Sequence, residues 1–371
     1  MYIRDISLVN FRNYDQLQLQ LTKGINIIYG NNAQGKTNLL ESIYVLALTK
    51  SHRSFIDNNL IKENKEISKI EGNININNII NNFKIIINNK TKKLKIDNDE
   101  IKKISNYISK LNIIIFYPED LDLIKGSPSV RRRFLNLELS QLNNNYLNIL
   151  NEYNRILKMR NDYIKLIFYG KTTDYSYFNI LTDYLIDKAI KLYQYRYDFI
   201  IKLNEKSSKI FKDISTLEGF NLKYKNSITF DDYQDDTIRE KLKNYYKNNF
   251  EREIKFKTTL IGPHRDDIEF YINNYNLKNY GSQGQQRMSV LSVKLAEIEI
   301  FKDNKKENPI LLLDDVFSEL DDNKKNNLLN YIKNDMQTII TTTDLKNIDK
   351  SIIEKSKLIE IENGKIIKEV N

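Results

Sequence analysis

The sequence contains no cysteine and only two histidines, and each shortage excludes a kind of site. A 371-residue chain without cysteine forms no disulfide, has no thiol nucleophile, and holds no cysteine-ligated zinc or iron–sulfur centre. The two histidines, His52 and His264, stand far apart in the chain, so the sequence gives little support to a metal site built on histidines. These shortages point away from thiol and histidine–metal chemistry, and they fit an intracellular location.

Long uncharged apolar segments are also missing. The first residues, MYIRDISLVNFRNY, carry acidic and basic side chains and lack the apolar core of a signal peptide. No uncharged apolar run anywhere reaches the length that a membrane span requires. We therefore expect a soluble, cytoplasmic protein, in which any transport role would need a separate membrane subunit.

Positive charge and apolar residues are present in quantity. Lysine and arginine outnumber aspartate and glutamate by 58 to 49, a formal net charge of +9, and 40% of the residues are hydrophobic. The length and apolar content suffice for two domains with a core in each. The charge favours an acidic partner such as DNA or RNA, but biased coding for lysine, asparagine and isoleucine explains it nearly as well.

The hydrophobic pattern predicts an α/β domain that is interrupted by a mostly helical insertion. Alternating residues indicate strands at 2–9 and 25–29 and an antiparallel meander over 66–97. Helical periodicity then runs through 146–167 and 180–203 with a turn around Gly170, which predicts a helical hairpin with several core tyrosines. Strands are expected to return in the segment KFKTTLIGPHRDDIEFYI, residues 255–272.

One phosphate-binding signature, G-x-x-x-x-G-K-[ST], follows the expected strand at 25–29. Its small residues let backbone N–H groups face phosphates, Lys36 reaches the β- and γ-phosphates, and the Thr37 hydroxyl ligates Mg²⁺. A helix with apolar residues at 39, 40, 43, 44 and 47 follows, as this motif requires. The predicted ATP-binding residues are Gly30, Asn31, Asn32, Ala33, Gln34, Gly35, Lys36 and Thr37.

Two carboxylates follow a run of aliphatic residues near the end of the chain. The run, residues 310–313, is typical of a strand buried on both faces of a parallel sheet, and Asp314 and Asp315 stand where it emerges. Asp314 is placed to hold Mg²⁺ through its water shell, and Asp315 to orient the attacking water.

The stretch GSQGQQR, residues 281–287, opens an amphipathic helix. The Ser282 hydroxyl and the free N–H groups at this helix start form a second anion-binding site. Because one ATP already has a phosphate loop, a second γ-phosphate sensor implies a composite site between two subunits.

The serine–glycine–glutamine pattern resembles the signature motif of ABC ATPases, in which two heads sandwich two ATPs. Together with the phosphate loop, the Asp-Asp strand and SELD at 318–321, the resemblance narrows to the RecF family of SMC-like ABC ATPases. It rests on seven ordered segments: NFRNY, SHRS, FYPEDL, RRRFLN, GPHRDD, SQGQQR and LLLDDVFSELD.

The resemblance implies an ABC-type head with lobe I from 1–122 and 301–371, and lobe II from 123–300. It further implies an ATP-dependent homodimer that binds DNA at single-strand gaps and junctions, and helps RecO and RecR place RecA there. ATP and Mg²⁺ are the implied cofactors and weak DNA-stimulated ATP hydrolysis the activity. Residues carried over are Lys36, Asp314 as the Mg²⁺ residue, Asp315 as general base, Arg12 beside the nucleotide, and Ser282, Gln283, Gly284 and Gln285 as the signature acting in trans.

Some positions depart from ABC heads or stay open. The base is Asp315 where many relatives have glutamate, and the shorter side chain predicts slow hydrolysis. Thr341, Thr342 and Thr343 stand near the usual histidine, and Glu119 near the usual glutamine, where helix capping is an equal alternative. His264 and Arg265 are either dimer or nucleotide contacts or a buried turn. Candidates for DNA phosphates are Arg131, Arg132 and Arg133, which could equally be a solvated face.

Three other functions are weighed against the DNA clamp. A transporter-type ATPase has a shorter interval between phosphate loop and signature than the one from Thr37 to Gly281. An SMC protein with long arms requires heptads that persist for many turns. A phosphate-loop kinase leaves the signature without a role.

Overall fold

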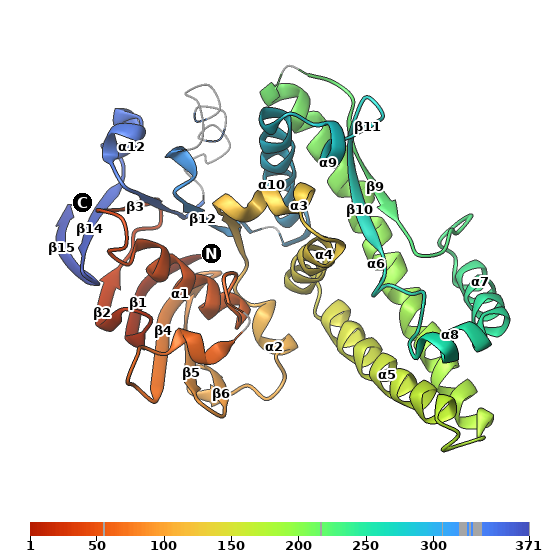
Figure 1. Cartoon of the computed structure of the whole chain (residues 1–371). Coiled ribbons are helices and arrows are strands. Elements are labelled where there is room, and N and C mark those ends of the chain that lie inside the picture. Colours follow the sequence, from red (N-terminus) through yellow and green to blue (C-terminus); the bar gives the residue numbers. More distant parts are fainter. Residues whose placement is uncertain are drawn as a thin grey trace. The chain divides into compact units, whose positions relative to one another are not determined.

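The computed structural model divides into two compact units (Figure 1). Unit 1 is formed by Met1–Asp120 and Lys294–Asn371, and unit 2 by Leu121–Val293. The structure describes residues 1–54, 56–215, 217–305, 307–318, 325, 328 and 336–370. Within these residues no helix is long and apolar enough to cross a membrane. The chain leaves unit 1 once and returns to it, so the first unit is built from both ends of the sequence.

The functional half of unit 1 is a mostly parallel sheet with the order β15-β14-β3-β13-β12-β8. Its central strands consist almost wholly of aliphatic and hydroxyl residues and are buried along their whole length, as expected for a sheet covered on both faces. The strands are β3 Ile25–Tyr29, β8 Ile113–Phe116, β12 Ile310–Asp314, β13 Thr338–Thr342, β14 Lys357–Glu362 and β15 Lys365–Val370.

A second, antiparallel sheet completes unit 1. It confirms the predicted meander over 66–97, and it also contains β2, whose alternating leucines and glutamines had not been assigned to a strand. Helix α1, Lys36–Leu48, contacts strands of both sheets and is therefore buried on nearly all sides. The strands are β1 Tyr2–Phe11, β2 Tyr14–Gln20, β4 Ile67–Ile76, β5 Ile79–Asn88, β6 Lys92–Ile96 and β7 Asp99–Glu100.

Short helices and 3-10 turns lie between the longer elements of the chain. They are the helices α2 Ser105–Ile108 and α12 Lys350–Ile353, and the 3-10 turns η1 Asp57–Leu60, η2 Pro118–Leu121, η3 Val316–Ser318 and η4 Leu345–Asn347.

Unit 2 is dominated by the predicted helical hairpin. Helices α5 and α6 pack along one another and are joined through Gly170, whose φ of +66° suits glycine. Tyr146, Tyr153 and Tyr193 are buried in the hairpin, which confirms their assignment to the core. The same assignment is wrong for Tyr184, which is exposed, and Tyr163 is half-buried. The helices are α3 Asp122–Lys125, α4 Pro128–Leu142, α5 Asn144–Phe168, α6 Tyr175–Ser215, α7 Asp235–Asn248, α8 Phe250–Phe256, α9 Leu277–Tyr280 and α10 Gln283–Lys305, of which α10 continues into unit 1 from Lys294.

A small antiparallel sheet, β11-β10-β9, accompanies these helices, with strands β9 Phe220–Lys225, β10 Asp267–Ile272 and β11 Tyr275–Asn276. The expectation of strands through 255–272 is wrong for its first part. Helix α8 extends to Phe256, and only the part from Asp267 onward is a strand. The buried Glu253 at the end of α8 accepts hydrogen bonds from Arg160 and from the Leu260 N–H, which hold the intervening segment as a turn.

Candidate functional site

The phosphate loop lies between β3 and α1, as the motif predicts. Gly30 has a φ of +148°, and a Cβ there would lie 2.3 Å from the carbonyl oxygen of Ile361. Gly35 has a φ of +112°, and a Cβ there would meet the side chains of Asn13 and Tyr14. The two glycines of the motif are therefore required both for their backbone conformation and for the close packing around the loop.

Lys36 folds back over the loop that precedes it. Its Nζ donates hydrogen bonds to the carbonyl oxygens of Gly30, at 2.8 Å, and Asn31, at 2.7 Å. Burial lowers the pKa of the Lys36 ammonium, while the charges of Asp315 and Asp314 act in the opposite direction. The lysine is thus held at the loop by acceptors that a bound phosphate could replace.

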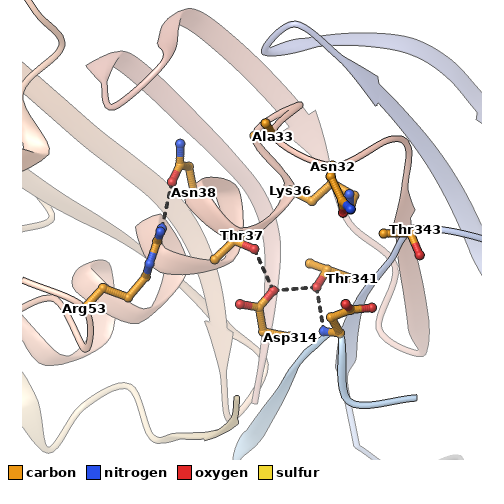
Figure 2. A pocket seen from close by; sticks show the side chains of 11 residues that line it. Asn32, Ala33, Lys36, Thr37, Asn38, Arg53, Asp314, Thr341 and Thr343 are labelled. Carbon is orange, nitrogen blue, oxygen red and sulfur yellow. Dashed lines mark hydrogen bonds between the residues drawn. The ribbon is translucent and has the colours of Figure 1, made fainter. Parts of the chain in front are cut away.

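Asp314 is the last residue of β12, and its carboxylate accepts hydrogen bonds from two threonine hydroxyls (Figure 2). The Thr37 Oγ1 lies 2.9 Å from the Asp314 Oδ1, and the Thr341 Oγ1 lies 2.7 Å from the same oxygen. Burial raises the pKa of the Asp314 carboxyl, and the hydrogen bonds from Thr341 and Thr37 counter part of that rise. The predicted Mg²⁺ residues Thr37 and Asp314, distant in sequence, are therefore in direct contact.

Asp315 directly follows β12 and has a left-handed backbone with a φ of +52°. Its N–H lies 3.2 Å from the carbonyl oxygen of Thr341 and 3.1 Å from the Thr341 Oγ1. Aspartate tolerates this conformation better than glutamate because its short polar side chain bonds locally. A non-glycine residue with this backbone marks a position where the surrounding structure dictates the geometry.

A polar pocket of about 360 Å³ brings these residues together. Of the predicted site it contains part of the phosphate loop and both carboxylates, whereas Gly30, Asn31 and Gln34 do not line it. It also contains residues to which the sequence assigned no binding role, notably Arg53 and Asn38. The lining residues are Asn32, Ala33, Gly35, Lys36, Thr37, Asn38, Arg53, Asp314, Asp315, Thr341 and Thr343.

Gln34 has a different task from its neighbours in the loop. Its carbonyl oxygen accepts from the N–H of Gly364, and its Oε1 accepts from the N–H of Asn363 at 2.6 Å. The turn between β14 and β15 therefore supports the phosphate loop from outside.

Arg53 lines this pocket and also forms an ion pair with a buried carboxylate on α1. The fully buried Glu41 lies one helical turn after Thr37, and the Arg53 guanidinium lies 3.6 Å from its Oε2. The Arg53 Nη1 also donates to the Asn38 Oδ1 at 2.9 Å (Figure 2). The segment SHRS was noted in the sequence, but Arg53 could be recognised as a site residue only once its position was known.

Arg12 occupies the other side of the same carboxylate. Its Nε and Nη2 donate to the two oxygens of Glu41 at 2.9 and 2.7 Å, and its Nη1 donates to the carbonyl oxygen of Asn59. Arg12 does not line the pocket, whereas Arg53 does; the expected contact of Arg12 with nucleotide stays a prediction.

The signature stretch starts α10 in unit 2. The Ser282 Oγ accepts from the Gln285 N–H at 3.2 Å, and the Gln285 Oε1 accepts from the Ser282 N–H at 2.9 Å. These reciprocal bonds form a capping box, which confirms the predicted helix start. Ser282, Gln283 and Gly284 are exposed, and a Cβ on Gly284 would meet nothing within 4 Å. The motif is thus a helix start whose conformation is fixed by the capping box and which is accessible to solvent.

Arg131 and Arg132 of the arginine run in α4 donate hydrogen bonds to other residues of unit 2. Arg131 is buried, donates through Nε and Nη2 to Asp267 at 2.6 and 2.9 Å, and caps two carbonyls at the end of α3. Arg132 donates to the carbonyl oxygen of Asp266 at 2.9 Å, and Arg133 is half-buried. The proposed DNA contact by Arg131 is therefore corrected: its guanidinium joins α4 to β10.

The GPHRDD segment forms the turn between α8 and β10, not a loop between two strands. Tyr153 and the Nδ1 of His264 are 2.6 Å apart, and burial lowers the pKa of His264 to about 4. Asp266 is buried and accepts from the Tyr224 hydroxyl and the Ser227 N–H. A packed turn thus accounts for His264, while Arg265 is exposed.

Glu119 is exposed and does not line the pocket. The neighbouring Asp120 makes the local capping bond, accepting from the Tyr117 N–H at 2.9 Å, and burial raises its pKa to about 6. In the segment SELD, residues 319–321 lie outside the described residues.

Comparison with known proteins supports a single assignment. The model of the RecF/RecN/SMC N-terminal domain family matches residues 2–367. The proteins named DNA replication and repair protein RecF from Listeria welshimeri and Bacillus subtilis are each 43% identical to this chain, and each match covers 99% of it and 100% of the relative. A solved structure of RecF with ATP, described as a recombination mediator of the RecFOR pathway, matches with a TM-score of 0.93 and 32% identity, over 100% of this chain and 98% of that one. An Smc head from Pyrococcus furiosus shares the fold alone, with a TM-score of 0.54 and 15% identity.

Proposed function

The chain belongs to the RecF family, and on that premise we propose that it is an ATP-switched DNA-binding protein of recombinational repair and replication restart. In this proposal ATP drives two copies into a head-to-tail dimer that clamps DNA at single-strand gaps and junctions. The dimer then helps RecO and RecR load RecA, and slow, DNA-stimulated ATP hydrolysis resets it. The cytoplasm, where bacterial DNA lies, is the proposed place of action.

The nucleotide site carries this proposal. The phosphate loop, Thr37 and Asp314 surround one polar pocket, and a relative in the same family is described as a complex with ATP. The Thr37 hydroxyl and the Asp314 carboxylate are hard oxygen donors, which suit Mg²⁺. Among the described residues no group of three or more acidic, histidine or cysteine side chains could hold a metal by itself. That fits Mg²⁺, which takes the rest of its ligands from nucleotide phosphates and water.

Hydrolysis is assigned to Asp315. Its carboxylate would accept a proton from the attacking water as the water oxygen attacks the γ-phosphorus and ADP leaves. Lys36 and the loop N–H groups would stabilise the phosphate oxygens, and Mg²⁺ would neutralise part of their charge. Because the aspartate reaches less far than a glutamate, we expect slow turnover and a long-lived dimer.

Dimer formation is assigned to the signature in unit 2. Ser282, Gln283, Gly284 and Gln285 would contact the γ-phosphate bound to the partner copy, since Ser282, Gln283 and Gly284 are exposed at a helix start, where a phosphate binds favourably. In this assignment unit 1 is lobe I and unit 2 is lobe II of an ABC-type head. The DNA contacts of the clamp are not assigned to residues.

Sedimentation of the purified protein, with and without ATP, Mg²⁺ and gapped DNA, tests the proposal. The wild type should pass from monomer to dimer with ATP and then co-sediment with DNA. Lys36→Met should stay monomeric because it loses the phosphate contact. Ser282→Arg should bind ATP but stay monomeric, because its defect lies in the contact with the partner.

Ser176→Arg is the matched control, since Ser176 is also an exposed serine near the start of a helix in unit 2. It should dimerise like the wild type. A wild-type protein that stays monomeric at saturating ATP and ignores DNA would refute the clamp, and Ser282→Arg that dimerises normally would refute the signature assignment alone.

A further inference from the structure

We propose that Thr341 is a positioning residue that couples the carboxylate of Asp314 to the catalytic aspartate, Asp315, through a single hydroxyl group. The inference rests on the proposed ATP hydrolysis and adds a residue to it. Thr341 lies on β13, directly opposite Asp314 on the neighbouring parallel strand β12, and it is buried. The sequence placed Thr341, with Thr342 and Thr343, near the usual histidine of ABC heads but gave it no role of its own.

The hydrogen-bond directions at this hydroxyl follow from counting its hydrogens. The Asp315 backbone N–H can only donate, so the Thr341 Oγ1 accepts from it at 3.1 Å. The hydroxyl has one hydrogen of its own, and the nearest acceptor is the Asp314 Oδ1 at 2.7 Å, whereas the carbonyl oxygen of Leu313 is 3.5 Å away. Thr341 therefore donates to one aspartate and accepts from the next (Figure 2).

The donated bond fixes the Asp314 side chain. The same Oδ1 also receives the Thr37 hydroxyl, which comes from α1 on the nucleotide side of the pocket. Because Thr37 is also assigned as an Mg²⁺ ligand, its hydrogen bond to Asp314 depends on whether Mg²⁺ and nucleotide are bound. Thr341 belongs to the sheet and supplies a support that does not depend on the ligand. Without it, a buried carboxylate would lose one of its two hydroxyl donors.

The accepted bond fixes the Asp315 backbone. Asp315 adopts a left-handed conformation, which a non-glycine residue keeps only when its surroundings enforce it. Its N–H is held by both the carbonyl oxygen and the hydroxyl of Thr341. Since the backbone conformation sets the direction of the side chain, Thr341 helps to decide where the catalytic carboxylate points. One hydroxyl thus aligns the metal-side and water-side carboxylates with each other.

Thr341→Val tests this because valine has the shape of threonine without the hydroxyl. We expect the kcat of ATP hydrolysis to fall about 10- to 100-fold, as for other residues that orient a metal ligand. The second readout is binding: the Mg²⁺ concentration needed for tight binding of a fluorescent ATP analogue should rise several-fold, while binding without Mg²⁺ stays unchanged. Thr341→Ser, which keeps the hydroxyl, should restore both values to within about threefold.

Thr338→Val is the matched control, because Thr338 is a buried threonine on the same strand whose hydroxyl has only a weak contact, 3.4 Å from the Met336 carbonyl. It should behave like the wild type. Wild-type kcat and Mg²⁺ dependence in Thr341→Val, or equal loss in Thr341→Ser, would overturn the proposal.

If Thr341→Val does not fold, the pair Thr341→Ala and Thr341→Ser replaces it, since both lack the methyl group and differ only in the hydroxyl. Thr341→Ala should have a lower kcat and need more Mg²⁺ for tight nucleotide binding, whereas Thr341→Ser should keep both values near those of the wild type. Equal values for the two variants would overturn the proposal. A wild type that hydrolyses no ATP contradicts the proposed function instead. If the wild type hydrolyses ATP, if this hydrolysis depends on Asp314, and if Thr341→Val has wild-type values, then only this inference is contradicted.

Discussion

The guanidinium of Arg12 forms a two-point hydrogen-bonded ion pair with Glu41, a fully buried carboxylate of α1. Burial alone would raise the Glu41 pKa, but hydrogen bonds from Arg12 and Ser51 outweigh it, and the pKa lies below its usual value. Arg53 shares the same carboxylate and extends to the pocket. Glu41 thus joins the end of β1 to a residue beside the phosphate loop.

Glu41→Gln should therefore destabilise unit 1. The substitution keeps the shape but leaves two arginines beside a neutral group, and we expect the free energy of unfolding to fall by about 3 kcal/mol. Urea denaturation followed by circular dichroism measures this. Glu218→Gln, which breaks an exposed pair with Lys212, is the control and should unfold like the wild type. A wild-type midpoint for Glu41→Gln would show that the ion pair contributes nothing.

Arg53→Gln should weaken nucleotide binding with little loss of stability. Its guanidinium lines the pocket, and a charged hydrogen bond to phosphate of about 2 kcal/mol corresponds to a loss of affinity of roughly 30-fold. Equilibrium titration with a fluorescent ATP analogue gives the value. Arg4→Gln, on the exposed part of β1, should bind as the wild type does. Unchanged affinity in Arg53→Gln would mean that Arg53 only shapes the loop around it.

Asp315→Asn should abolish most ATP hydrolysis while ATP-driven dimerisation persists. Asparagine keeps the size of the side chain and tolerates the left-handed backbone, but it accepts no proton, so turnover should fall at least about 100-fold. Steady-state phosphate release and sedimentation with ATP are the two measurements. The exposed Asp231→Asn serves as control. If phosphate release continues at the wild-type rate, the general base lies elsewhere.

His264 should make the stability of unit 2 fall on mild acidification. Its pKa is lowered by burial from 6.5 to about 4, so between these values the unfolded chain binds a proton that the folded chain does not. Stability is therefore unaffected above pH 6.5 and decreases as the pH falls below it, by at most about 3 kcal/mol near pH 4.

The variant His264→Asn isolates this effect, because the amide oxygen can replace Nδ1 as the partner of Tyr153. Thermal unfolding at pH 7.5 and pH 5.5 should show a smaller loss for the variant than for the wild type. Identical losses in both proteins would assign the acid sensitivity to groups other than His264. The nearby buried Asp266 is not one of them, because burial raises its pKa and its protonation therefore favours the folded chain.

The sequence predicted the elements whose pattern is local. Period-two alternation identified β1, β3 and the meander, and helical periodicity identified α5 and α6. It failed at residues 255–266, where strands were expected but α8 ends and a turn follows. There the ion pair of Glu253 with Arg160, joined across 93 positions of sequence, favours a helix end and a turn.

The candidate site likewise contains parts that the sequence predicted and parts that it did not. The phosphate loop and the signature were recognisable because each is one contiguous segment, and the proposed binding uses its backbone N–H groups. Arg12 and Arg131 were candidates for contacts with nucleotide and DNA because a charged side chain in a motif looks available. Their partners, Glu41 and Asp267, become neighbours only in the folded chain.

The sequence by itself thus determined the α/β class, the glycine-rich loop between β3 and α1, the acidic pair after β12 and the family. Only the tertiary structure decided that Thr37 meets Asp314, that Arg53 lines the pocket, and that Thr341 links two adjacent aspartates. The physical reason is that contiguous motifs encode their own backbone geometry, whereas side-chain partners on neighbouring strands are set by sheet register. That register joins Asp314 to Thr341 across 27 positions of chain.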